Sequence, residues 1–233
     1  MSNFIVVTGV SRGIGLEIAK RFSREGFGVV GCASSEKSAA AVREKHPGFD
    51  VVKADLSDKN DVRAFCEHVK NRCERIDVLV NNAGRYIPGK IETEADDTFE
   101  SLMALNVGGP YYVTKGLLEK MGAGSTVINI CSTASITAYP NGASYCISKF
   151  ALLGFSKVLR EELKPKDIRV VSLLPGATLT DSWAGVNLPS ERFIAAEDLG
   201  NIAWLAHSLK YGAVMEELVV RPLAGDIDES EFA

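Results

Sequence analysis

The 233-residue sequence predicts a single α/β domain built on a doubly wound parallel sheet of about seven strands, with helices on both faces. Short apolar runs alternate with helical segments along the whole chain. The runs are almost continuously apolar, as expected of strands that are covered on both faces. With 46% hydrophobic and 24% charged residues, the chain has the composition of a globular protein with a substantial core.

The first half of the chain is expected to hold four of the strands. The apolar run at 4–9 ends in glycine, and the helical segment at 35–46 ends before Pro47, which cannot continue a helix. The predicted strands are 4–9, 27–33, 50–55 and 76–84, and the predicted helices are 13–25, 35–46 and 58–74.

The second half continues the alternation without a linker or a repeat. Its predicted helices are 95–121, 143–164 and 196–210, and its predicted strands are 125–132, 168–176 and 217–222. Right-handed crossovers between such strands give a Rossmann-type sheet, whose ligands bind at the carboxyl ends of the strands. We expect one domain over residues 1–225 and a loose acidic tail over 226–233.

Composition and charge favour a cytoplasmic protein that binds neither nucleic acid nor membranes. The formal net charge is -4, and there is no run of lysine and arginine that would follow a phosphate backbone. The N-terminus lacks a signal-peptide pattern, and no apolar run reaches membrane-spanning length. The cysteines are odd in number, lack CxxC spacing and are not clustered with the histidines, so we expect neither disulfides nor a metal site; they are Cys32, Cys66, Cys73, Cys131 and Cys146.

The segment TGVSRGIG (residues 8–15) places three glycines between the first strand and the first helix. Gly9 permits a tight turn, Gly13 lets main-chain N–H groups approach a pyrophosphate, and Gly15 allows close packing of helix and strand. The alternative is a plain strand–helix turn. The predicted cofactor contacts of this loop are Gly9, Ser11, Arg12, Gly13, Ile14 and Gly15.

The end of the second strand indicates NADP(H) in preference to NAD(H). Proteins that prefer NAD usually carry a carboxylate there to bind the ribose 2′-hydroxyl. This chain has Ala33, Ser34 and Ser35 instead, and Arg12 is available to pair with a 2′-phosphate. Lys37 is a weaker candidate for the same contact, and both cations are otherwise solvated surface charges.

Tyr145 and Lys149 lie four residues apart on a predicted helix and therefore share a face. A protonated lysine beside a tyrosine stabilises the phenolate, so we expect the pKa of Tyr145 to be lowered toward neutral pH. Ser132, at the end of the fifth strand, is placed to hydrogen-bond the same substrate oxygen. A tyrosine and a lysine at this spacing are common on helix surfaces, so the pair alone is a weak indication.

The order of the motifs resembles the short-chain dehydrogenase/reductase family from about Phe4 to Pro222. The matching features are TGVSRGIG (8–15), Asp55, NNAG (81–84), Asn106, Ser132, Tyr145 with Lys149, and PGATLT (175–180). The resemblance implies a catalytic set of Asn106, Ser132, Tyr145 and Lys149, in which Asn106 holds a water molecule that connects the lysine to solvent.

The same resemblance implies further contacts with the cofactor. Asp55 would accept a hydrogen bond from the adenine amino group, with Leu56 contributing its main chain, and Lys149 would bind the nicotinamide ribose. The adenosine ribose would lie against Asn81, Ala83 and Gly84, and the nicotinamide carboxamide against Pro175, Gly176, Thr178 and Thr180. A plain Pro-Gly turn after a strand is the alternative for the last group.

Three loops are expected to surround the substrate, at 85–92, 133–142 and 179–195. Their aromatic and aliphatic residues predict a small or medium, partly apolar carbonyl compound, in contact with Ser132, Tyr139, Tyr145 and Trp183. Arg85 either recognises an anionic group or faces solvent. The short third loop speaks against steroids. The C-terminal ELVVRPLAGD lacks the glycine-rich ending of the acyl-carrier-protein reductases and resembles the small hydroxyacid, pterin or general aldehyde and ketone reductases.

The predicted activity is the NADP(H)-dependent reduction of a carbonyl compound to an alcohol, or the reverse, without a covalent enzyme intermediate. An epimerase or dehydratase on the same scaffold is one alternative. A non-catalytic NADP-binding regulator is another, although Tyr145 and Lys149 are both retained. The resemblance also implies a homodimer or homotetramer that pairs the helices 95–121 and 143–164 with their symmetry mates.

Overall fold

A seven-stranded parallel sheet forms the centre of the molecule and confirms the predicted fold class. The computed structural model describes residues 3–183, 185–210 and 212–227. Within them the strand order is β3-β2-β1-β4-β5-β6-β7. The strands are β1 (Phe4–Thr8), β2 (Gly28–Ala33), β3 (Phe49–Lys53), β4 (Val78–Asn81), β5 (Thr126–Ile130), β6 (Arg169–Pro175) and β7 (Glu217–Val220).

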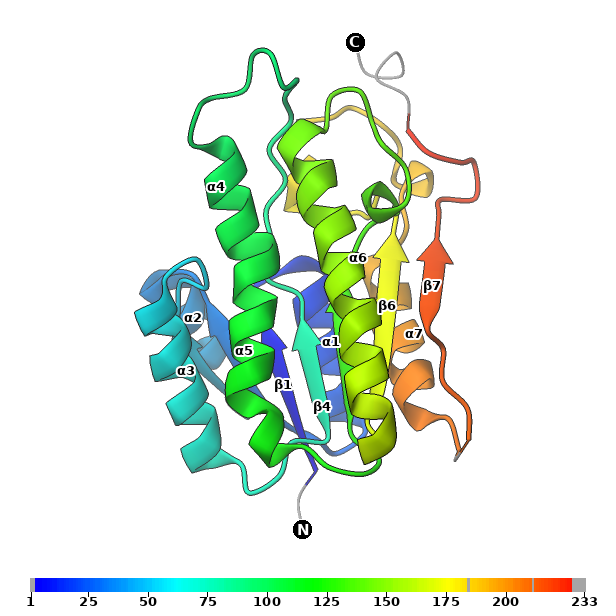
Figure 1. Cartoon of the computed structure of the whole chain (residues 1–233). Coiled ribbons are helices and arrows are strands. Elements are labelled where there is room, and N and C mark those ends of the chain that lie inside the picture. Colours follow the sequence, from blue (N-terminus) through cyan, green and yellow to red (C-terminus); the bar gives the residue numbers. More distant parts are fainter. Residues whose placement is uncertain (1–2, 184, 211, 228–233) are drawn as a thin grey trace.

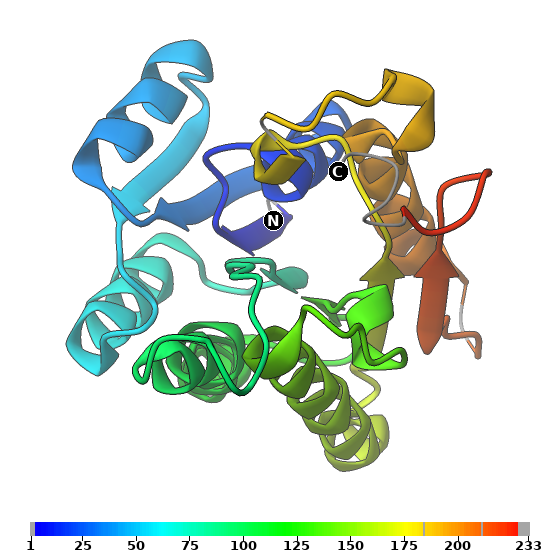
Figure 2. The same ribbon diagram turned by 90° about the horizontal axis from the view of Figure 1, so that it is seen from above.

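Helices cover both faces of this sheet, as Figures 1 and 2 show. One apolar layer joins the sheet to α1 (Gly13–Arg24), α2 (Glu36–Lys45) and α7 (Ala196–Ser208). The other joins it to α3 (Lys59–Arg72), α5 (Gly109–Leu117) and α6 (Ala143–Leu163). The buried strands therefore have no solvent-facing side, which explains their near-continuous apolar sequence.

Local sequence explains where these helices begin and how they are oriented. The side chain of Asp58 caps α3 by accepting hydrogen bonds from the main-chain nitrogens of Asn60 and Asp61, at 2.6 and 3.1 Å. Basic residues occupy the last turn of the same helix, where they complement the helix dipole. On α1, the buried residues Ile18 and Phe22 are four apart and face the sheet.

The predicted helix at 95–121 is interrupted. Its first segment is α4 (Thr98–Met103), and a π-helical turn over Ala104–Gly108 precedes α5. Asn106 lies inside the π turn, whereas the prediction placed it within one helix over residues 95–121. Helical periodicity alone does not show such a turn, because the turn adds only one residue to an otherwise regular pattern of apolar residues.

The strand order reverses between β1 and β4, so the connections leaving these strands run to opposite sides of the sheet. The glycine loop follows β1 and the NNAG segment follows β4, which places both motifs beside the resulting crevice. This is the position at which open α/β sheets bind their ligands.

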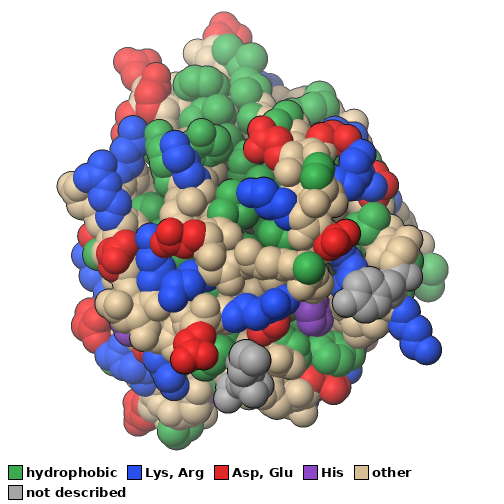
Figure 3. Space-filling view, turned by 60° about the horizontal axis from the view of Figure 1, so that its bottom comes forward, with side chains coloured by type: hydrophobic (Ala, Val, Ile, Leu, Met, Phe, Trp, Pro, Cys, Tyr) green, Lys and Arg blue, Asp and Glu red, His purple; other side chains and the backbone are tan. Residues whose placement is uncertain are grey.

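The surface of the described residues carries charges of both signs. On the face shown in Figure 3, basic and acidic side chains are interspersed. None of the described helices is long and apolar enough to cross a membrane, and the described residues contain no group of metal-ligating side chains. Ala184 of the third substrate loop and residues 228–233 of the predicted tail lie outside the described residues.

Candidate active site

The glycine loop has the backbone that a bound pyrophosphate requires. Gly9 and Gly13 adopt positive φ angles of 66° and 56°, which other residues rarely adopt. A Cβ on Gly15 would lie 2.5 Å from the main-chain oxygen of Gly9, so only glycine fits there. No side chain caps the N-terminus of α1. Its first N–H groups are therefore suited to bind an anion.

Thr8 and Asn82 hold this loop in place, and sequence reasoning missed both. The Thr8 hydroxyl oxygen accepts hydrogen bonds from the main-chain nitrogens of Asn82 and Ala83, at 2.9 and 3.0 Å. The Asn82 side-chain amide donates to the main-chain oxygens of Thr8 and Gly9, at 2.9 and 3.0 Å. The paired asparagines of NNAG were the available signal, because neighbouring strand residues face opposite ways.

Asn81 points its side chain into the core. Its amide nitrogen donates to Thr114 Oγ1 at 2.9 Å and to Asn129 Oδ1 at 2.8 Å, and the residue is 1% exposed. The predicted contact with the adenosine ribose therefore involves the main chain of Asn81. Ala83 is partly buried beside the loop and Gly84 is exposed at the same edge.

The end of β2 carries no carboxylate, in keeping with the sequence, but two of the nearby polar side chains are already engaged. Ala33 is buried, whereas Ser34 is exposed. The Ser35 hydroxyl accepts a hydrogen bond from the main-chain nitrogen of Ser38 and so caps α2. Arg12 forms an ion pair with Asp181, with 3.0 Å between Nη1 and Oδ2, although both side chains are mostly exposed. Arg12 is thus bound to the third substrate loop.

Asp55 and Leu56 follow β3 at the same edge of the sheet. Asp55 is exposed, and its Oδ1 accepts hydrogen bonds from the main-chain nitrogen and the hydroxyl of Ser57, at 3.0 and 2.7 Å. Leu56 is buried and packs near Gly109 of α5. The arrangement leaves the Asp55 side chain on the surface, where the predicted adenine contact places it.

Ser132, Tyr145 and Lys149 come together where β5 meets α6. Ser132 follows β5 and caps the short turn Thr133–Ser135, and its hydroxyl lies close enough to Tyr145 to lower the pKa of that phenol. Lys149, one helical turn beyond Tyr145, is buried and donates from Nζ to the main-chain oxygen of Ile130 at 3.0 Å. The Tyr86 ring lies edge-on against Tyr145, with 4.9 Å between the ring centres. The predicted cluster therefore exists, with Tyr86 as an additional neighbour.

The expected lowering of the Tyr145 pKa is not found. Burial raises the pKa of Tyr145 to about 12, and the nearby Ser132 hydroxyl offsets only part of this effect. Lys149 Nζ lies 5.9 Å from the centre of the Tyr145 ring, and burial lowers the pKa of the lysine itself. The prediction was wrong because removal of both groups from water outweighs their mutual attraction in this structure.

Asn106 joins three segments through its amide group. Its Oδ1 accepts a hydrogen bond from the main-chain nitrogen of Arg85 at 2.9 Å. Its Nδ2 donates to the main-chain oxygen of Arg85 and to Ser148 Oγ, both at 3.0 Å. The π turn directs this side chain toward the strand end after NNAG. Its role in holding a water molecule stays a prediction.

The Pro-Gly segment after β6 lies between the glycine loop and the C-terminal segment. Pro175 ends β6, and the main-chain nitrogen of Gly176 donates to the main-chain oxygen of Val220 at 2.8 Å. Thr178 is buried and donates to the main-chain oxygen of Gly176 at 3.0 Å. A Cβ on Gly13 would lie 3.0 Å from Thr180 Cγ2. The predicted cofactor contacts from these two parts of the chain are therefore neighbours.

The predicted substrate residues Tyr139 and Trp183 lie on different loops and are both engaged by other residues. The Tyr139 hydroxyl is within hydrogen-bond distance of Asp226 and Thr133. Trp183 packs against Phe193, with 5.2 Å between the ring centres. The Arg85 guanidinium donates to Ser101 Oγ at 3.3 Å, so a polar group of the chain itself, rather than solvent alone, contacts it.

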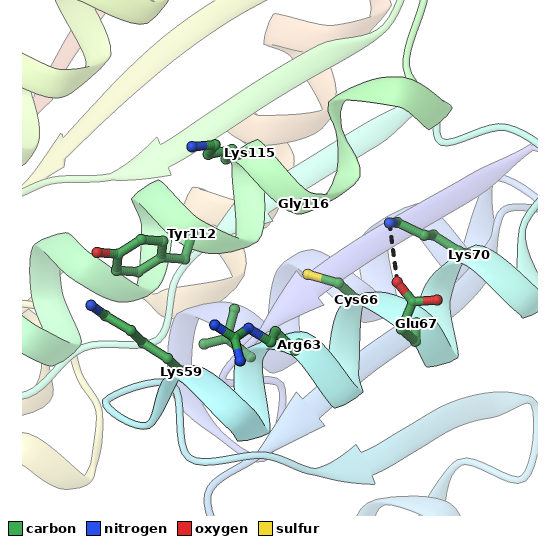
Figure 4. A pocket seen from close by; sticks show the side chains of 9 residues that line it. Lys59, Arg63, Cys66, Glu67, Lys70, Tyr112, Lys115 and Gly116 are labelled. Carbon is green, nitrogen blue, oxygen red and sulfur yellow. Dashed lines mark hydrogen bonds and ion pairs between the residues drawn. The ribbon is translucent and has the colours of Figure 1, made fainter.

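A separate hollow of about 230 Å³ lies between α3 and α5 (Figure 4). Lys59 Nζ lies 4.9 Å from the centre of the Tyr112 ring at one end, and Lys70 pairs with Glu67 at 3.1 Å at the other. The hollow is smaller than usual small-molecule sites, and none of the predicted site residues lines it. It is therefore distinct from the predicted substrate site.

A doubly wound sheet with a glycine loop at its switch point, and with serine, tyrosine and lysine grouped at the same edge, defines an oxidoreductase of the Rossmann type. The chain belongs to the short-chain dehydrogenase family, whose model matches residues 3–190. The resemblance inferred from the motifs is thereby confirmed.

Relatives along the whole chain agree with this assignment. The chain is 30% identical to a sepiapterin reductase of Chlorobaculum tepidum, over 98% of this chain and 100% of that protein. It is 33% identical to a 3-oxoacyl-acyl-carrier-protein reductase of Haemophilus influenzae, over 86% of this chain and 89% of that one.

Solved structures show the same fold with bound cofactors. An alcohol dehydrogenase from Thermococcus sibiricus, complexed with 5-hydroxy-NADP, matches with a TM-score of 0.86 and 25% identity, over 98% of this chain and 100% of that one. An actinorhodin polyketide ketoreductase with NADPH matches with a TM-score of 0.84 and 27% identity, over 95% and 96% of the two chains. Together with the glycine loop, these neighbours support nicotinamide-cofactor binding by this chain.

Proposed function

We propose that this protein is an NADP(H)-dependent carbonyl reductase in which Tyr145 donates the proton. The observation that carries the proposal is the cluster of Ser132, Tyr145 and Lys149, in which Lys149 is buried one helical turn beyond Tyr145. The group lies at the carboxyl end of β5, on the same sheet edge as the glycine loop. The sepiapterin reductase and the NADPH-bound ketoreductase among the relatives support this activity.

In the direction of carbonyl reduction, Tyr145 acts as the proton donor. At neutral pH its phenol is protonated, so it is ready to donate to an oxygen that gains negative charge. The Ser132 hydroxyl binds the same oxygen and orients it. When bound, the nicotinamide cofactor would supply the hydride. Lys149 would bind the nicotinamide ribose, for which its Nζ must exchange the Ile130 oxygen for a ribose hydroxyl.

We assign the preference for NADP(H) over NAD(H) to Ala33 and Arg12. Ala33 places no carboxylate against a 2′-phosphate, and Arg12 lies in the loop that follows β1. The Arg12–Asp181 pair is mostly exposed, and exposed pairs contribute little free energy. A 2′-phosphate therefore replaces Asp181 as the partner of Arg12 at low cost.

The proposed substrate class rests on aromatic residues in two of the predicted substrate loops. Tyr86 contacts the Tyr145 ring, and Trp183 packs on Phe193 in the third loop. These aromatic groups support a small or medium carbonyl compound with an apolar or aromatic substituent. The loops carry no large insertion beyond them.

We also propose a homo-oligomer in the cytoplasm. Tyr111 on α5 and Ile147, Phe150 and Val158 on α6 are exposed apolar side chains, as expected of helices that pair with a second copy. The five cysteines are free and buried, in keeping with a reducing compartment.

The test follows NADPH and NADH absorbance with a panel of ketones, aldehydes, diketones and pterins. We expect turnover with NADPH for at least one class, and Tyr145→Phe is expected to lower kcat by about a hundredfold or more. Tyr112→Phe, an exposed tyrosine on α5, is the matched control. Full activity in Tyr145→Phe would contradict the assignment of the proton donor. NADPH binding without turnover would favour the alternative of a non-catalytic NADP-binding regulator.

A further inference from the structure

Asp226 connects the C-terminal segment to two of the predicted substrate loops. Its Oδ2 accepts a hydrogen bond from the Tyr139 hydroxyl at 2.9 Å and pairs with Arg221. Arg192 donates to the main-chain oxygens of Gly225 and Asp226, at 3.3 and 3.4 Å. The carboxylate therefore binds Tyr139 and Arg221, while the main chain beside it binds Arg192.

Tyr139 continues this connection toward the catalytic serine. Its hydroxyl has a single proton, which the carboxylate attracts more strongly than a neutral oxygen does. The same hydroxyl lies 3.1 Å from Thr133 Oγ1, and Thr133 directly follows Ser132 in the turn that Ser132 caps. Displacement of Tyr139 therefore affects the turn that fixes the Ser132 side chain.

The C-terminal segment also packs against the predicted nicotinamide end of the site. A Cβ on Gly176 would lie 3.2 Å from Pro222 Cδ and 3.6 Å from Thr133 Cγ2. Pro222 is buried, and Arg221 and Asp226 flank it in sequence. The segment 221–226 thus contacts the Pro-Gly turn on one side and Tyr139 on the other.

We infer that Asp226 is a positioning residue for the substrate site. Its carboxylate holds the loop 133–142 against the segment 221–226, and through Tyr139 and Thr133 it keeps Ser132 in place. The loop 179–195 is joined to the same segment by Arg192, which binds its main-chain oxygens. Because the Tyr139 hydroxyl is bound to Asp226 and Thr133, Tyr139 offers a substrate its ring and not a hydrogen bond. The inference deepens the proposed function and rests on it for its catalytic meaning.

The structural test compares main-chain hydrogen–deuterium exchange in the parent, Asp226→Asn, Tyr139→Phe and the double variant, without any substrate. We expect exchange over residues 133–142 to accelerate about three- to tenfold in each single variant, the factor that one such hydrogen bond is worth. Both single variants weaken the contact between Tyr139 and Asp226, so the effect of the double variant is expected to fall short of the sum of the two single effects. Unchanged exchange in Asp226→Asn, or full additivity in the double variant, would overturn the inference.

Two further variants separate this role from a general effect of removing surface charge. Glu216→Gln removes a carboxylate that pairs with Arg160 elsewhere on the surface, and it is expected to leave exchange over 133–142 unchanged. Asp226→Glu keeps the charge and is expected to restore part of the protection. Acceleration by Glu216→Gln as large as that by Asp226→Asn would contradict a local role.

The kinetic test uses benzil and diacetyl with NADPH. We expect Asp226→Asn to raise KM for benzil by about three- to tenfold, with a smaller change in kcat, because the loops that bind the substituent are loosened. A purely structural role would lower the active fraction and leave KM unchanged. If neither diketone is reduced, the proposed function fails for this class, while the exchange measurement still decides the role of Asp226.

Discussion

In the nucleotide half of the site, side chains bind main-chain atoms, whereas in the substrate half side chains bind one another. In the nucleotide half, Thr8 and Asn82 bind main-chain atoms of the glycine loop and of the NNAG segment. In the substrate half, Tyr139 contacts Asp226, 87 residues away, and Trp183 packs on Phe193. The first arrangement is rigid and independent of the substrate; the second is suited to vary with it.

The largest effect is expected when a glycine of the nucleotide half gains a side chain. A Cβ on Gly15 meets the main-chain oxygen of Gly9 at 2.5 Å, so Gly15→Ala is expected to lower the free energy of unfolding by about 2 kcal/mol and to weaken NADPH binding at least tenfold. Urea denaturation and NADPH fluorescence titration measure the two effects. Gly154→Ala on α6, where no atom lies within 4 Å of the new Cβ, is the control and should stabilise the protein slightly.

A rise to alkaline pH tests the buried thiols and the buried phenol of Tyr145. Burial raises the pKa of Cys32 to about 12 and the pKa values of Cys66 and Cys73 to about 11, and the pKa of Tyr145 to about 12. A raised folded-state pKa gives stability that is fully present below the unfolded value, near pH 9 for the thiols, and is lost as pH rises toward the folded value. The lowered pKa of Lys149 acts in the opposite sense.

We therefore expect the urea midpoint to fall between pH 9 and pH 11. Over this range, Cys32→Ala should reduce the loss in free energy of unfolding by roughly 2–3 kcal/mol, because it removes an acid whose folded pKa is raised to about 12. Tyr145→Phe should act only above about pH 10, the ordinary pKa of tyrosine. An unchanged profile in Cys32→Ala would show that the thiol does not contribute, and Tyr112→Phe serves as an exposed control.

A moderate effect is expected from Asn82→Ala. The variant removes the hydrogen bonds to the main-chain oxygens of Thr8 and Gly9, so the free energy of unfolding should fall by about 1–2 kcal/mol. NADPH affinity should fall with it, because the glycine loop is less well fixed. Asn71→Ala, on the exposed side of α3, should change neither quantity. Equal stability and equal NADPH affinity in the two variants would contradict the role of Asn82 in holding the glycine loop.

The smallest effect is expected where the two halves touch. Asp181→Asn frees Arg12 from an exposed ion pair, so the affinity for NADPH should rise about two- to threefold while the affinity for NADH stays the same. Fluorescence titrations with both cofactors measure the ratio. Glu191→Gln, in the same loop, is the control. An equal gain for both cofactors would contradict the proposed contact of Arg12 with the 2′-phosphate.

The difference between the halves also explains what sequence analysis achieves. The parallel sheet, the glycine loop and the cluster of Ser132, Tyr145 and Lys149 were predictable, because buried strands, tight turns and helix faces each require particular residue types at fixed spacing. The pKa of Tyr145 was not, because burial depends on how the whole chain packs. The pairs Arg12–Asp181 and Tyr139–Asp226 were missed for a related reason, since no local pattern marks partners so far apart.

The π turn over Ala104–Gly108 has a consequence for deletions in this chain. A π turn contains one residue more than a regular helix needs, so removal of one residue from it would restore a continuous α-helix with better hydrogen bonds. Because the wider π turn accommodates its extra residue locally, α4 and α5 would keep nearly the same relative orientation, while the side chains within the turn would change direction. Asn106 would leave Arg85, and the loop at 85–92 would lose its anchor. A shorter helix would thus stabilise the chain locally while destroying the site, which makes this insertion a cost in stability that the activity requires.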